Sequence, residues 1–212
     1  MRAGGIILCG GKSSRMGLPK ATLPFGSEFM LQRVHRLLSE VVRPIVVVVA
    51  EGQPLPGLPT GTLYACDQRP DRGPLEGLLA GMKAIEPVCD LAYVTSCDVP
   101  LLQPSLVRQL LQLTADFDAV APRQEEFCHP LSAVYQTRII PTIEKLLARD
   151  LLRASNLLQQ IRTRYIPVDD LRLSDPNLLT LRNLNRPEEY FEALAVAGFE
   201  IDPTIKAGLL AK

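Results

Sequence analysis

Residues 5–26, GIILCGGKSSRMGLPKATLPFG, carry the most distinctive pattern in this chain of 212 residues. The apolar run at residues 6–9 stops at two adjacent glycines, Gly10 and Gly11. The loop that follows has no acidic residue before Glu28 and carries three cations: Lys12, Arg15 and Lys20. Glycine lets backbone N–H groups approach a ligand without a Cβ in the way, and N–H groups with fixed cations bind polyphosphates. The stretch therefore predicts a buried strand that leads into a nucleotide phosphate loop.

Two common phosphate-binding loops do not match this stretch. A P-loop reads G-x-x-x-x-G-K-[ST], and Gly11-Lys12-Ser13 fits its end, but its first glycine would fall on Ile6. The dinucleotide motif G-x-G-x-x-G cannot be placed on the glycines at positions 10, 11 and 17 either. The loop is therefore of another kind, with the spacing G-G-x-S-x-R-M-G-x-x-K.

The charge balance argues against a nucleic-acid partner. The chain has 23 lysines and arginines against 23 aspartates and glutamates, a formal net charge of +0. An extended basic face, which nucleic-acid binding needs, is not supported by such a balance. Positive charge is instead concentrated locally, in the loop after Gly11.

The cysteines and the apolar runs indicate a cytoplasmic protein. The five cysteines are widely spaced and never form C-x-x-C, and the chain has only two histidines, so neither a zinc site nor a disulfide framework is expected. The first apolar run is too short for a signal peptide. No stretch reaches the ~20 apolar residues that a membrane-spanning helix needs, and no membrane association is expected.

Apolar, β-branched runs alternate with segments whose apolar residues recur every three or four positions. The runs predict strands at residues 6–9, 45–50, 62–66, 91–97 and 165–168, an edge strand at 119–122, and a returning strand at 129–135. The helical spacing predicts helices at residues 30–42, 74–82, 104–113, 137–148, 155–161 and 187–197, and a short helix in the tail after residue 199. This alternation predicts a three-layer α/β fold with a doubly wound, mostly parallel sheet, in one domain over residues 1–212.

Ligands of such folds gather at the carboxyl ends of the strands, and polar residues follow several of these ends. Gly10 and Gly11 follow the first strand, Asp67 follows the third, and Asp98 follows the fourth. A carboxylate there can hold Mg²⁺ together with phosphate oxygens. From position alone, a metal ligand and an ordinary turn carboxylate are equally good interpretations of Asp98, and turn chemistry explains Asp67 well.

The loop motif resembles the signature loop of single-domain nucleotidyltransferases, and among them that of the molybdenum cofactor guanylyltransferases (MobA family). Four further segments are similar to that family and occur in the same order: Gly73-Pro74-Leu75-Glu76-Gly77, Cys97-Asp98-Val99-Pro100, His129-Pro130 and Asn183-Leu184-Asn185-Arg186-Pro187-Glu188. The resemblance implies a Rossmann-like nucleotidyltransferase fold. It also implies that GMP passes from GTP to the Mo-molybdopterin cofactor, which yields the guanine dinucleotide form of the cofactor and pyrophosphate.

The resemblance assigns roles to particular residues. Arg15 and Lys20 would hold the phosphates and neutralise the charge that develops on pyrophosphate, and Asp98 would bind Mg²⁺ as well as the nucleotide. Three cations within nine residues, without an acidic partner, also favour a functional loop over a merely solvated one. The implied nucleotide-binding set is Leu8, Cys9, Gly10, Gly11, Ser13, Lys20, Asp67 and Asp98.

Some positions bear on the choice of substrate. Gly11 matches the guanylyl-transferring members, whereas relatives that transfer cytidylyl groups usually read L-A-A-G here. Cys9 replaces the family's alanine, and Ala50-Glu51 stands where the family commonly has an asparagine for the nucleotide. Cys128 replaces the usual aspartate before His129-Pro130, on the acceptor side.

Two alternatives to the guanylyltransferase hypothesis stay open. The chain could use CTP with molybdopterin, or a sugar or polyol phosphate as acceptor. It could also be a nucleotide-binding protein without enzymatic activity, although the presence of both Lys20 and Asp98 argues against this. Molybdoenzymes and cofactor-insertion proteins are further candidate partners. A lone histidine beside a proline is more often structural than catalytic, so His129 is not assigned to catalysis.

Overall fold

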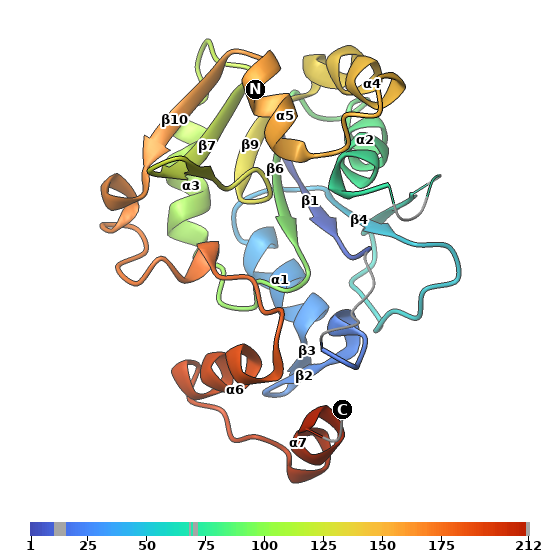
Figure 1. Ribbon diagram of the computed structural model, residues 1–212, viewed down its shortest axis with the longest axis vertical. Helices are drawn as coiled ribbons and strands as arrows, with labels where there is room; N and C mark the ends of the chain where they lie inside the picture. The colour runs from blue at the N-terminus through green and yellow to red at the C-terminus, as the bar shows by residue number, and fades with distance from the viewer. Residues whose placement is uncertain (11–15, 68, 70–71, 211–212) are drawn as a thin grey trace.

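The computed structural model describes residues 1–10, 16–67, 69 and 72–210. Its central sheet has the order β10-β7-β9-β6-β1-β4-β5, and β8 pairs with the end of β7 (Figure 1). The strands are β1 (Ala3–Leu8), β4 (Ile45–Val49), β5 (Leu63–Cys66), β6 (Leu91–Ser96), β7 (Ala119–Gln124), β8 (Phe127–Cys128), β9 (Ala133–Gln136) and β10 (Thr163–Pro167). The predicted doubly wound, mostly parallel sheet is confirmed: β9 is antiparallel to both β6 and β7, and the β6-β1-β4-β5 run is parallel.

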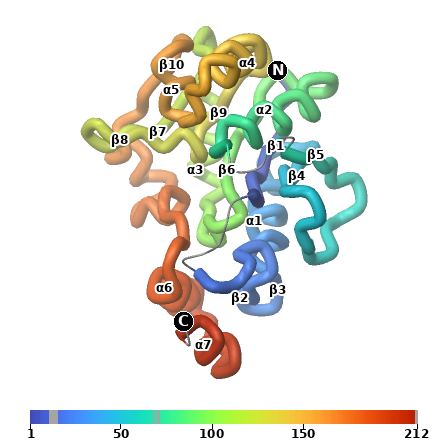
Figure 2. The backbone as a smooth tube through the Cα atoms, turned by 45° about the vertical axis from the view of Figure 1, so that its right-hand side comes forward, coloured from blue at the N-terminus to red at the C-terminus, as the bar shows by residue number. Residues whose placement is uncertain are grey.

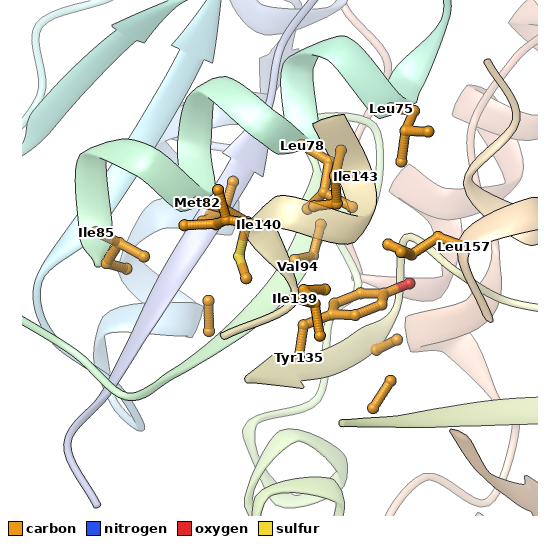
Figure 3. Close-up of a cluster of buried hydrophobic side chains, with 14 of the residues drawn as sticks. Leu75, Leu78, Met82, Ile85, Val94, Tyr135, Ile139, Ile140, Ile143 and Leu157 are labelled. Carbon is orange, nitrogen blue, oxygen red and sulfur yellow. The ribbon is translucent and has the colours of Figure 1, made fainter. Parts of the chain in front are cut away.

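Helices cover both faces of this sheet. One face carries α2 (Pro74–Ile85), α4 (Ile140–Ala148) and α5 (Ala154–Gln160), and the other carries α1 (Met30–Ser39) and α3 (Pro104–Gln112). Figure 3 shows the first face, where side chains of α2 and α4 interdigitate over Val94 and Tyr135. Burying these apolar side chains is the main source of stability for the three layers.

Gly81 explains how closely α2 approaches the sheet. A Cβ at this position would lie 2.6 Å from Ile6 Cγ2 of β1 and 3.0 Å from Val48 Cγ2 of β4. A larger residue here would force the side chains of Ile6 and Val48 to shift, whereas glycine allows the close approach. Gly77, one turn earlier, has ordinary space around it, so α2 is held tightly to the sheet at its middle.

A third apolar cluster lies beyond the sheet. It joins the short hairpin of β2 (Pro24–Phe25) and β3 (Glu28–Phe29) to α6 (Pro187–Val196) and the predicted tail helix, α7 (Pro203–Leu210). Figure 2 shows these elements side by side at one end of the molecule. Four 3₁₀ turns complete the described elements: η1 (Lys20–Thr22), η2 (Thr137–Ile139), η3 (Val168–Leu171) and η4 (Leu179–Leu181).

One strand prediction was wrong. Residues 119–122 were expected at an edge of the sheet, but β7 lies between β9 and β10. The cause is the parallel pairing of Ala119 with Thr163, 44 positions later, which no local pattern reveals. Residues 163–167 therefore supply the outer strand on this side of the sheet.

Candidate active site

A cavity of about 900 Å³ opens at the carboxyl ends of β1, β4 and β6. The arrowheads of β1 and β6 in Figure 1 point toward this edge of the sheet. Six residues that the sequence predicted for the nucleotide line the cavity: Leu8, Cys9, Gly10, Lys20, Asp67 and Asp98. The remaining three predicted site residues, Gly11, Ser13 and Arg15, lie outside the described residues.

Asp98 has the densest set of polar contacts at the cavity. Its Oδ2 accepts a hydrogen bond from Lys20 Nζ at 2.7 Å. Its Oδ1 accepts from Asn183 Nδ2 at 2.9 Å and from the hydroxyl of Ser96. Because both oxygens are engaged and the residue is only 8% exposed, the orientation of this carboxylate is set by the protein itself.

The segment at residues 183–185 completes this arrangement. Asn185 Oδ1 accepts from Lys20 Nζ at 2.8 Å, and the backbone N–H of Leu184 donates to the carbonyl of Asp98 at 2.9 Å. Lys20 and Asn185 are 165 positions apart in the chain. The fold thus brings three distant segments into one hydrogen-bonded group around Asp98.

Asp67 lies at the same cavity but has far fewer contacts. It is half-buried, and its backbone N–H donates to the carbonyl of Val49 at 3.1 Å. Within the described part of the chain its side chain accepts one hydrogen bond, from the backbone N–H of Arg69 at 3.0 Å. Toward the described residues, its carboxylate therefore keeps most of its acceptor capacity for a ligand.

Sequence reasoning did not assign Asn183, Asn185, Ser96 or Gln53 to the site. The two asparagines had a signal, the N-x-N-x-P-E likeness, but no role followed from it. Ser96 precedes Cys97-Asp98 and has no signal of its own. Gln53 had none either: its Nε2 donates to the carbonyl of Cys9 at 3.0 Å, and its Oε1 accepts from Ala50 N at 3.2 Å.

Gln53 lies three positions beyond Ala50, where the resemblance led us to expect an asparagine. Its side chain lines the cavity and bridges the ends of β1 and β4. An amide is thus present at this edge of the site, but it comes from a later position in the loop than the motif indicates.

The thiol of Cys9 is unsuited to ionic chemistry. The neighbouring Cys97 thiol raises the pKa of Cys9 well above its usual value, and burial raises it further. The group therefore stays protonated at neutral pH, and both cysteines belong to the apolar cluster beneath the cavity.

The carboxylates at the cavity fit a hard divalent cation such as Mg²⁺. In residues 1–10, 16–67, 69 and 72–210, no group of three or more His, Cys, Asp or Glu side chains could hold an ion by itself. Mg²⁺ does not need such a group, because it binds through one or two carboxylates and takes its other ligands from phosphates and water. Asp98, with Asp67 at the same cavity, meets that requirement.

Comparison with known proteins identifies the family. The model of the MobA-like NTP transferase domain matches residues 5–164. A protein of Pelotomaculum thermopropionicum named probable molybdenum cofactor guanylyltransferase is 31% identical over 93% of this chain and 94% of its own length. One of Desulfosudis oleivorans, named molybdenum cofactor guanylyltransferase, is 32% identical over 90% of this chain and 94% of its own length.

Solved structures share the fold at lower identity. Molybdopterin-guanine dinucleotide biosynthesis protein A of Archaeoglobus fulgidus superposes with a TM-score of 0.76 at 20% identity, over 92% of this chain and 98% of that one. The 2-C-methyl-D-erythritol 4-phosphate cytidylyltransferase of Thermus thermophilus gives a TM-score of 0.65 at 17% identity, over 93% and 100%. No helix in the described residues is long and apolar enough to cross a membrane. On the family match and the near full-length relatives, the chain belongs to the MobA-like NTP transferase domain family of nucleotidyltransferases.

Proposed function

We propose that this protein transfers GMP from GTP to Mo-molybdopterin in a Mg²⁺-dependent reaction. The phosphate of the acceptor attacks the α-phosphorus of GTP, a new P–O bond forms, the bond to the bridging oxygen breaks, and pyrophosphate leaves. The observation that carries the proposal is the Lys20–Asp98 pair at the cavity that Gly10 also lines. The names of the full-length relatives support guanine and the molybdenum cofactor in particular.

Both reactants are anions, so the barrier comes mainly from charge repulsion and misalignment. An ammonium group has three N–H donors. In the described part of the chain, Asp98 and Asn185 take two of those of Lys20, which leaves one for a phosphate oxygen. Lys20 is thus held in place to neutralise charge on the triphosphate as the bond to pyrophosphate breaks.

Asp98 would hold the metal, and Asp67 would contact the nucleotide. When bound, Mg²⁺ would supply positive charge that offsets the negative charge of the phosphates. Asn183 and Ser96 fix Oδ1 of Asp98, so the carboxylate would keep its direction when a metal binds. No general base is required, because a phosphate acceptor is already largely ionised near neutral pH.

The direct test supplies GTP, CTP, UTP and ATP separately, each with Mg²⁺ and Mo-molybdopterin. Pyrophosphate release and the mass of the dinucleotide product are measured, with reactions lacking acceptor or Mg²⁺ as controls. We expect product with GTP only, and a thermal shift that is largest with GTP and Mg²⁺. Preference for CTP, or a sugar phosphate as the better acceptor, would replace this proposal with the related transferase. Absence of pyrophosphate under every combination would favour a binding protein.

A further inference from the structure

Asp175 is a buried carboxylate away from the substrate cavity. It is 1% exposed, and no lysine or arginine among the described residues forms an ion pair with it. A carboxylate is rarely this buried without a cation, because loss of hydration is costly unless hydrogen bonds replace the water. The charge of Asp175 is therefore compensated by the hydrogen bonds that its oxygens accept.

Both carboxylate oxygens of Asp175 accept backbone N–H groups of one 3₁₀ turn. Leu179 N donates to Oδ1 at 2.9 Å, and Thr180 N donates to Oδ2 at 2.8 Å. These N–H groups open η4, where a turn has no partners of its own for its first donors. Hydrogen bonds to an ionised acceptor are stronger than neutral ones, so Asp175 fixes this turn firmly.

Thr180, which is fully buried, attaches η4 to two other segments. Its hydroxyl accepts from the backbone N–H of Gln103 at 2.9 Å, just before α3. Its carbonyl accepts from Ser132 Oγ at 3.4 Å, just before β9. The position of η4 relative to the sheet is thus defined from three directions.

The chain runs from η4 directly into the site. Three residues after Thr180, Asn183 donates to Asp98, and two residues later Asn185 accepts from Lys20. An extended chain covers at most about 3.6 Å per residue. Because the connection from Thr180 to Asn185 is this short, a displacement of η4 is transmitted to both amides. Asn183 and Asn185 thus lie at one end of a short segment, and Asp175 holds the other end, η4, in place.

We propose that Asp175 is a positioning residue for nucleotidyl transfer. It holds η4 so that Asn183 and Asn185 keep Asp98 and Lys20 in their reactive arrangement, and it does not touch the substrate. The inference rests on the proposed function in so far as Asp98 and Lys20 are the reacting centre. It adds a residue that lies outside both the cavity lining and the loop motif.

The test compares Asp175→Asn and Asp175→Ala with the wild-type protein. Asparagine keeps the size of the side chain but removes the charge and one acceptor. A misplacement of about 1 Å at a reacting centre can lower turnover about 10²-fold. We expect kcat to fall 10- to about 100-fold, more for alanine than for asparagine. KM for GTP should change less than about threefold, because the Leu8–Gly10 and Gln53 side of the cavity is untouched.

Asp202→Asn is a control for the loss of a helix cap outside the site, at an exposed carboxylate. Asp202 also accepts two backbone N–H groups at the start of a helix, from Thr204 at 2.7 Å and Ile205 at 3.2 Å, but it caps α7. This variant should lose a similar cap without a change in kcat. If Asp175→Asn keeps kcat within twofold of wild type, or loses no more than Asp202→Asn does, the proposal is wrong.

Hydrogen exchange of backbone amides separates this proposal from the proposed function, because it needs no substrate. Asp175→Asn should speed exchange at residues 179–185 and leave β1 and β6 protected, whereas Asp202→Asn should speed exchange in α7 only. Unchanged exchange at residues 179–185 overturns the positioning role whatever the substrate is. If GTP proves not to be used, the kinetic arm is run with the triphosphate that releases pyrophosphate.

Discussion

Asp98 and Asp67 follow strands on either side of β1 and lie at the same cavity, yet the protein holds them very differently. Asp98 accepts hydrogen bonds from three side chains: Lys20, Ser96 and Asn183. In the described residues the side chain of Asp67 accepts one hydrogen bond, from the backbone N–H of Arg69. The strands differ in the same way, since β6 is buried along its whole length and β5 is a largely exposed edge.

Under the proposed function, this difference indicates that Asp98 and Asp67 have different roles at one site. A group that stabilises charge in a transition state is most effective when it is oriented in advance, because no reorganisation is then needed during reaction. Asp98 has that property. Asp67 has open acceptor capacity instead, which suits a group that binds a ligand's hydroxyl or amine and adjusts to it. Asp98 should therefore govern turnover, and Asp67 should govern affinity.

Replacing Asp98 should have the largest effect. Asp98→Asn keeps the size of the side chain and an oxygen for Asn183, but it removes the charge that faces Lys20 and would hold Mg²⁺. Loss of one preorganised electrostatic group costs about 10²–10³-fold in kcat, and we expect at least that loss. Pyrophosphate release at saturating GTP, measured over a range of Mg²⁺ concentrations, checks this.

The fold of that variant must be verified separately, since Lys20 loses a charged partner. Circular dichroism and the melting temperature serve as controls. Turnover within tenfold of wild type, at any Mg²⁺ concentration, would contradict the role given to Asp98 and would remove the basis of the comparison.

Asp67→Asn should have a smaller effect of a different kind. Its one hydrogen bond in the described residues, from the N–H of Arg69, can be kept by an amide oxygen, so little of the local structure should change. We expect KM for the nucleotide to rise about tenfold, equivalent to about 1.4 kcal/mol of binding, with kcat nearly constant. Steady-state kinetics and calorimetric titration with GTP measure the two quantities. A fall in kcat with unchanged KM would exchange the roles of the two carboxylates.

The same contrast shows what sequence could predict. Asp98, Asp67 and Gly10 were placed at one edge because each follows an apolar run, and in a parallel sheet the ends of such runs meet there. That inference is local. The roles of these residues came from the resemblance to the MobA family. Asn183 and Asn185 carried only a motif likeness, and nothing in the spacing indicated that they reach Asp98.

Gln53 and Asp175 could not be predicted at all. The role of Gln53 depends on a loop that returns to the end of β1, and that of Asp175 depends on a turn formed several residues later. The error at β7 has the same origin, because its outer partner comes from residues 163–167. Continuous apolar runs reveal which segments are strands, but long-range pairing decides their neighbours.

The smallest predicted effect concerns the attachment of β5, the strand that precedes Asp67. His35 of α1 is buried, and its Nε2 lies 3.0 Å from the hydroxyl of Thr62, immediately before β5. Burial, and then the charge of Arg43, lower the pKa of His35. The neutral ring is thus favoured in the folded protein, and acid should loosen the attachment of β5 while leaving the Asp98 side intact.

The sign follows from proton uptake. Below the unfolded pKa of about 6.5, the unfolded chain binds a proton that folded His35 does not, so the free energy of unfolding falls as pH decreases. The loss is at most about 1.4 kcal/mol per pH unit for this group, and none is expected above pH 7. Burial also lowers the pKa of His129, which contributes with the same sign. Glu28, whose pKa is lowered by its hydrogen bond from Arg36, contributes only in more acidic solution.

Urea unfolding at pH 7.5 and 5.5 therefore isolates the histidines, and His35→Gln isolates one of them. The wild-type protein should lose more stability between the two pH values than His35→Gln does, and the remaining loss should belong to His129. Hydrogen exchange, corrected for intrinsic rates, should show residues 55–67 opening at pH 5.5 and residues 91–98 staying protected. Two results would contradict this: an equal loss of stability in the two proteins, or opening of β6 together with β5. Either would mean that the two sides of the site are held by one shared set of interactions. The division between a fixed Asp98 and an adaptable Asp67 would then fail.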